Sequence, residues 1–149
     1  MRGRQGFTFI ELLIVMVVIG LLAVLAVLRY VDLRNHAVAS GVVSDLNAVR
    51  LAAYNHWADH ESFPGDAGAG ATPPDLEPYL RTGFDFTRPL YSFDWENNGG
   101  GGGMRVGVVV TSPSNSLMSI LARRSNNGQP YFVVGNTLTY VIVGPDGNL

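Results

Sequence analysis

Glu11 is the acidic residue of an apolar run that begins at Phe7 and ends at Leu28. From Leu12 to Leu28 there are 17 consecutive uncharged residues, nearly all of them apolar. A carboxylate at the centre of a membrane helix costs roughly 2.5–3.5 kcal/mol, and less near the helix end. Position alone therefore allows an interfacial carboxylate. A charge in low dielectric nevertheless favours a partner of opposite sign.

His56 and His60 form a second candidate group, with acidic residues at positions 59 and 61. Their i, i+4 spacing on a helix suits a transition metal, but no third ligand is evident. The alternative is a solvated helix end, where histidine complements the helix dipole. The sequence presents no nucleophile–base pair and no carboxylate dyad, so it predicts a protein that is not an enzyme.

Composition excludes several classes of protein. The chain has 149 residues, ten arginines, no lysine, twelve acidic residues and a net charge of −2, a balance that argues against a nucleic-acid partner. The five glycines at 99–103 are not a phosphate-binding loop, because no Gly-Lys-Ser/Thr follows them. There is no cysteine, so disulfides and thiolate sites are excluded.

One long helix must position Glu11. No proline occurs between Met1 and Phe63, and the 22 residues 7–28 would span ~33 Å as a helix, enough to cross a membrane. Beyond them, apolar residues recur at spacings of three and four, which predicts an amphipathic continuation over 29–62: Val38, Val42, Leu46, Val49, Ala53 and Trp57. Pro64-Gly65 then forbids further helix.

The membrane segment has competing interpretations. A cleaved signal peptide is disfavoured by the long apolar run and the absence of a clean small-x-small site. A plain signal anchor explains the length but not Glu11. Arg2 and Arg4 favour a cytoplasmic N-terminus, although Arg29 and Arg34 weaken that signal.

The rest of the chain predicts two hairpins. "YSFDWE" (91–96) alternates apolar and polar residues, and "MRVGVVVT" (104–111) is its return strand. A short helix capped by Ser112 follows. The last hairpin turns at Gly135-Asn136. A long helix followed by four strands predicts an α+β fold, with the helix packed on a small antiparallel sheet.

The stretch "GFTFIE", after a short basic leader, resembles the processing site of type IV prepilins and type II secretion pseudopilins. The resemblance implies that a prepilin peptidase removes residues 1–6 by cutting between Gly6 and Phe7 and that Phe7 is then N-methylated. Glu11 matches the acidic residue of that family. One helical turn away, it would pair with the new ammonium of its own chain or of a neighbour, and would thereby set the register of assembly.

The resemblance implies a pilin-like fold in which 7–28 is the transmembrane and filament-core helix and 63–149 a periplasmic globular domain. The short leader, the small domain and the lack of a disulfide favour a type II secretion pseudopilin that supports protein export. A type IV pilin for adhesion, motility or DNA uptake is the alternative. A monomeric membrane-anchored periplasmic binding domain is an alternative of another class.

Partners and location follow from the same resemblance. They are the peptidase/methylase, other copies or related subunits, an inner-membrane assembly platform and membrane lipid, with no nucleic acid. The chain would cross the inner membrane once, with its N-terminus in the cytoplasm. No cofactor is predicted, but calcium, held in some relatives, has Asp66, Asp94 and Asp146 as candidate ligands. Leu28 stands where many pilins have a helix-kinking proline.

Overall fold

The computed structural model describes residues 6–98, 105–125 and 131–144. Its first element is α1 (Phe9–His60), a continuous helix of 52 residues, as the sequence predicts. The chain forms two compact units, Met1–Asn35 and His36–Leu149, so α1 contributes to both. The helix ends at Glu61, whose φ of 56° is left-handed and whose N–H donates to the Trp57 carbonyl at 2.7 Å.

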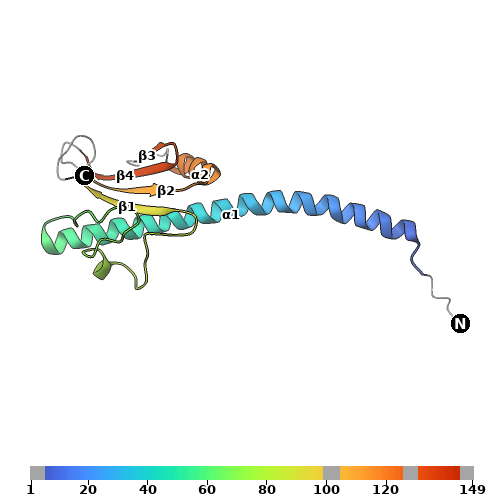
Figure 1. The fold of residues 1–149 in the computed structure, drawn as a ribbon, viewed down its shortest axis with the longest axis horizontal. Coiled ribbons are helices and arrows are strands. Elements are labelled where there is room, and N and C mark those ends of the chain that lie inside the picture. The colour runs from blue at the N-terminus through green and yellow to red at the C-terminus, as the bar shows by residue number, and fades with distance from the viewer. Residues whose placement is uncertain (1–5, 99–104, 126–130, 145–149) are drawn as a thin grey trace. The chain divides into compact units, whose positions relative to one another are not determined.

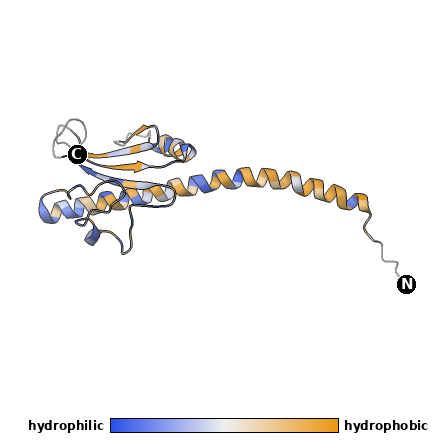
Figure 2. Ribbon diagram, in the orientation of Figure 1, coloured by the Kyte–Doolittle hydropathy of each residue, from blue (hydrophilic) through white to orange (hydrophobic). Residues whose placement is uncertain are grey.

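The first unit is an apolar helix with no protein core around it. Its large apolar side chains, from Phe7 to Leu33, are 47–81% exposed, and Figure 2 shows the nearly unbroken apolar colouring of this half of α1. By length and composition, α1 is long and apolar enough to cross a membrane. Exposed apolar surface of this extent is stable only in lipid or against other protein surfaces.

In the second unit, α1 buries one face against a sheet (Figure 1). Its buried apolar residues are Ala39, Val42, Leu46, Val49, Ala52 and Ala53. The prediction that Trp57 belongs to this face is wrong, because its side chain is 48% exposed. Steps of four residues advance 400° around a helix, so an apolar series drifts off the buried face. His56 takes the buried position instead, with Nδ1 2.8 Å from the Ser62 carbonyl oxygen.

The sheet has four antiparallel strands in the order β1-β2-β4-β3. They are β1 (Ser92–Asn97), β2 (Val106–Thr111), β3 (Tyr131–Val134) and β4 (Thr137–Val143). Both predicted hairpins are confirmed, and Gly135 adopts the positive φ of 58° that its tight turn requires. The pairing of β2 with β4 joins the hairpins into one sheet. The α+β, pilin-like fold class is therefore confirmed.

Helix α2 (Asn115–Ser125) connects β2 to the second hairpin. The predicted helix is present, but its cap is Ser114 and not Ser112. The Ser114 hydroxyl accepts the Leu117 N–H at 3.3 Å. Ser112 is fully buried and donates to the Leu90 carbonyl at 2.7 Å. Ser112 also accepts the Ser114 N–H at 3.2 Å, but it lies three residues before Asn115, where α2 begins, so Ser114 occupies the cap position.

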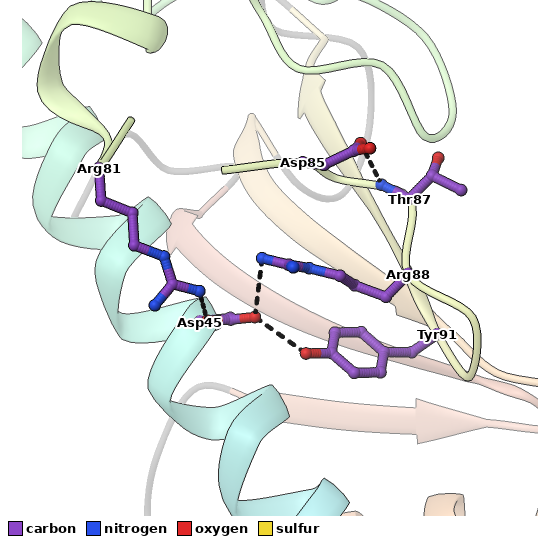
Figure 3. A network of polar contacts seen from close by, with 6 residues as sticks. All are labelled: Asp45, Arg81, Asp85, Thr87, Arg88 and Tyr91. Atoms are coloured by element: carbon purple, nitrogen blue, oxygen red, sulfur yellow. Dashed lines mark hydrogen bonds and ion pairs between the residues drawn. The ribbon is translucent and has the colours of Figure 1, made fainter. Parts of the chain in front are cut away.

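The segment between α1 and β1 contains the 3-10 helix η1 (Glu77–Tyr79) and is tied to α1 by a polar network around Asp45 (Figure 3). Asp45 is only 8% exposed. Its carboxylate meets Arg81 at 3.1 Å and Arg88 at 3.6 Å, and accepts the Tyr91 hydroxyl at 2.9 Å. Burial, together with the Asp45 hydrogen bond, raises the pKa of Tyr91 to about 12. Tyr91 therefore remains a hydrogen-bond donor throughout the physiological pH range.

Candidate processing and assembly site

Thr8 and Glu11 form a capping box at the start of α1. The Glu11 Oε2 atom accepts the Thr8 N–H at 2.8 Å and the Thr8 hydroxyl at 2.7 Å. In return, the Thr8 Oγ1 atom accepts the Glu11 N–H at 3.3 Å. Two N–H groups that a helix end leaves unpaired are thereby satisfied. The carboxylate also lies at the positive end of the helix dipole.

Thr8 is a residue that the sequence analysis did not single out. The signal was available, since "TFIE" follows the Ser/Thr-x-x-Glu pattern that precedes an apolar run. The capping box gives Glu11 a local role that requires no other subunit. It also fixes the carboxylate within one turn of Phe7, where the predicted ammonium would form.

Gly6 and Phe7 lie before α1 in a segment without helix or strand. Both are exposed, Phe7 by 81%. A Cβ atom added at Gly6 would meet no atom within 4 Å, and its φ is not positive. The described fold therefore gives no reason for a glycine at this position. Residues 1–5, the rest of the predicted leader, lie outside the described part of the chain.

Two of the candidate calcium ligands, Asp66 and Asp94, lie near each other. Burial raises the pKa of Asp94, and the nearby Glu96 and Asp66 carboxylates raise it further. Asp146 lies outside the described residues. The His56 and His60 rings stack with centroids 4.5 Å apart. Within the described residues, no group of three or more His, Cys, Asp or Glu side chains is placed to hold a metal ion.

The fold and this N-terminal site define a class of α+β proteins with an exposed apolar helix and a processing motif in front of it. Residues 1–27 match the family model of the prokaryotic N-terminal methylation motif. This match, together with the relatives described next, confirms the resemblance to type IV prepilins that "GFTFIE" indicated.

Curated relatives match part of this chain and part of their own length. A fimbrial protein of Pseudomonas aeruginosa is 40% identical over 77 residues, which cover 52% of this chain and 47% of the relative. The type IV narrow pilus major component PilA5 of Thermus thermophilus is 50% identical over 52 residues, covering 35% of this chain and 44% of the relative. The chain thus spans about half the length of the curated relatives it matches. No solved structure matches it.

The names of these relatives describe structural pilus proteins and not enzymes. The sequence-based expectation of a structural, pilin-like subunit is therefore confirmed at that level. The finer assignment to secretion pseudopilins is not confirmed, because the comparisons do not separate pseudopilins from pilins.

Proposed function

We propose that this chain is a filament subunit that a prepilin peptidase cuts between Gly6 and Phe7 and then methylates on Phe7. The match of residues 1–27 to the N-terminal methylation motif carries this proposal. The exposed, non-helical bond before α1 supports it, since a protease needs an extended and accessible segment. The unexplained glycine at position 6 supports it as well.

In the proposed mechanism, cleavage makes Phe7 an ammonium one helical turn from the Glu11 carboxylate. Two opposite charges in a low dielectric attract strongly, and each is costly when unpaired. The capping box holds Glu11 until assembly. An incoming subunit is then favoured only in the register that pairs its charges with those of a neighbour.

The membrane part of the proposal rests on the exposed apolar half of α1. The subunit would be stored in the inner membrane as a single span over 7–28, with its globular unit in the periplasm. An assembly platform would then transfer the same apolar surface from lipid to a helix bundle. The transfer is feasible because lipid tails and neighbouring apolar helices are equally dry.

Two filament types have specific support. The secretion pseudopilus is favoured by the six-residue leader, the small domain and the absence of cysteine. The surface pilus is favoured by the relatives, which are named as a fimbrial protein and a pilus component. Deleting the gene in its host would separate them. Loss of exported protein without loss of surface filaments indicates the pseudopilus, and the reverse indicates the pilus.

The first experiment is the mass of the N-terminal peptide of the protein extracted from membranes of its native host. We expect a peptide that begins at N-methyl-Phe7. The variant Gly6→Val should accumulate as an uncut precursor, with its fold intact because a Cβ atom added at position 6 meets no atom within 4 Å. An intact leader in cells that process other prepilins would instead indicate a monomeric anchored domain.

A further inference from the structure

A cavity of about 300 Å³ lies in the second unit between α1, α2, β3 and β4. Its floor is apolar and includes Leu46, Leu121 and Leu138. Polar side chains line the rest: Asn47, Arg50, Arg124 and Tyr131. We call this the arginine groove. Its size is at the lower end of the range for pockets that bind small molecules or large side chains.

The two arginines of the groove lack a charged partner among the described residues. Arg50 donates to the Tyr140 hydroxyl at 3.0 Å, and Arg124 donates to the Ser40 hydroxyl at 3.0 Å. Both acceptors are neutral. The ion pairs found within the described residues all use Asp45, with Arg81 and Arg88 as its partners. An apolar floor with two unneutralised guanidinium groups fits an occupant that is apolar and anionic.

The same unit carries such a surface at the end of α1. Trp57 is 48% exposed, and its ring stacks with Phe63 at a centroid distance of 6.4 Å. Glu61, four residues after Trp57, is an exposed carboxylate. Asp59 is exposed as well, but it accepts the Tyr79 hydroxyl at 2.7 Å and does not share a helix face with Trp57. We call Trp57 and Glu61 the helix-end patch. Within the described residues, Glu61 forms no ion pair. Tryptophan is among the residues that most often supply the binding energy of an interface.

The groove and the patch cannot meet within one molecule. Leu46 and Trp57 are 11 residues apart on the same helix, so about 16 Å of helix axis separates them. A patch that fits a groove elsewhere on an identical molecule makes a head-to-tail contact, which repeats without closing and generates a filament. The complementarity of charge and of apolar surface therefore points to a second copy of this chain.

We propose that the helix-end patch of one copy docks into the arginine groove of the next, with Trp57 on the apolar floor and the Glu61 carboxylate facing Arg50 and Arg124. This inference rests on the proposed filament function and adds a contact between globular units to the contacts of the apolar helices. It assigns a pairing role to two arginines that have no ion pair within the described residues.

Disulfide trapping tests the contact in the full-length chain, which has no cysteine of its own. The double variant Asn47→Cys with Ser62→Cys places one thiol on the groove rim and one beside the helix-end patch. Oxidation in intact cells should give a ladder of dimers, trimers and longer species, because the contact is open-ended. A mixture of the two single variants should stop at dimers. The control pair Ser62→Cys with Thr111→Cys, which has one thiol outside the groove, should give no ladder.

The second test of the contact exchanges the charges of the groove and of the helix-end patch. Arg124→Glu should lower filament yield about tenfold, the effect of losing one hydrogen bond to a charged group. Glu61→Arg should do the same, and the two together should restore most of the yield. The matched control is Arg123→Glu, on the same helix but outside the groove, which should leave the yield unchanged.

The outcomes separate this inference from the proposed function. Absence of the ladder, or failure of the double exchange to restore yield, overturns the docking. Normal filaments in the docking variants would leave the proposed function standing. Absence of filaments from the wild-type chain would overturn the proposed function. A ladder of crosslinked species in membranes of cells without filaments would still support the contact between globular units. An anionic small molecule as the true occupant predicts no ladder and no restoration, and therefore counts against the docking.

Discussion

The Glu11 carboxylate caps α1, and in the proposed function it also pairs with an ammonium. Both roles use the same carboxylate, but they differ in what they require. The capping box needs an acceptor at the third helical position, which glutamine supplies as well as glutamate. The charge pair needs a negative charge. The distances to Thr8 establish the first role, whereas the second is part of the proposed function.

We therefore expect Glu11→Gln and Glu11→Ala to insert normally into the membrane but to lower filament yield by about tenfold or more, since both lose a charge-assisted contact. Thr8→Ala breaks the capping box but keeps the carboxylate, and should assemble. Immunoblots of sheared filaments measure the filament yield, and immunoblots of membranes measure insertion. Normal yield from Glu11→Gln would leave Glu11 with its capping role alone.

Asp94 is a residue that weakens the fold at neutral pH. Burial raises its pKa, with the Glu96 and Asp66 carboxylates as further causes. Its Oδ1 atom is buried without a hydrogen-bond partner in the described structure. The folded chain binds a proton at Asp94 more tightly than the unfolded chain does, so the charged carboxylate destabilises the fold fully at pH values above the raised pKa. This destabilisation disappears as the pH falls through the raised pKa toward the ordinary value of 3.8.

Asp94→Asn should therefore raise the free energy of unfolding by about 1 kcal/mol at pH 7, because it removes the charge of a half-buried carboxylate whose Oδ1 atom has no hydrogen-bond partner in the described structure. Below about pH 3.8 the difference should vanish, since the wild-type carboxyl is then neutral in both states. Urea unfolding at the two pH values measures this. The exposed Asp75→Asn is the control, and an equal gain there would attribute the effect to net charge.

At the scale of elements, the backbone is strained at the C-terminal end of α1. Glu61 has a φ of 56°, a conformation that favours glycine and is unfavourable for a residue with a Cβ atom. Helices commonly end in this conformation, usually with glycine at that position. The strain is tolerated because the Glu61 N–H closes the last turn and Pro64 prevents helix from continuing.

Glu61→Gly should stabilise the globular unit by about 1 kcal/mol, measured as a higher urea midpoint. Glu61→Ala removes the same carboxylate but keeps the strained φ, so we expect little change. Equal stabilisation by both variants would assign the effect to charge and not to the backbone. The glycine variant should nevertheless assemble poorly, because it deletes a carboxylate of the helix-end patch.

At the scale of the whole molecule, none of the described residues before position 38 belongs to the hydrophobic core. Its buried members begin at Ala39, and Val38 is the first partly buried residue packed against them. The apolar half of α1 therefore contributes surface for lipid or for other subunits, and adds nothing to the core of the second unit.

A chain that begins at Arg29 should consequently be soluble and should unfold cooperatively. A shorter chain that begins at Asn35 should have a melting temperature within about 2 °C of the first. Circular dichroism and thermal melts measure this. Aggregation of the shortened chain, or a lower melting temperature after truncation to Asn35, would show that residues before His36 support the globular unit.

The sequence by itself determined the long helix, the two hairpins and the processing motif, because each depends on local patterns. An unbroken apolar run, strict alternation in "YSFDWE" and the "GFTFIE" stretch are all readable over a few residues. The tertiary structure decided the β2–β4 pairing, the burial of His56 in place of Trp57 and the displaced cap of α2. It also brought Asp45 to Arg81, Arg88 and Tyr91, and Arg50 to Arg124. The β2–β4 pairing and the contacts of Asp45 join residues dozens of positions apart. Their geometry depends on how the helix packs on the sheet, which no local pattern encodes.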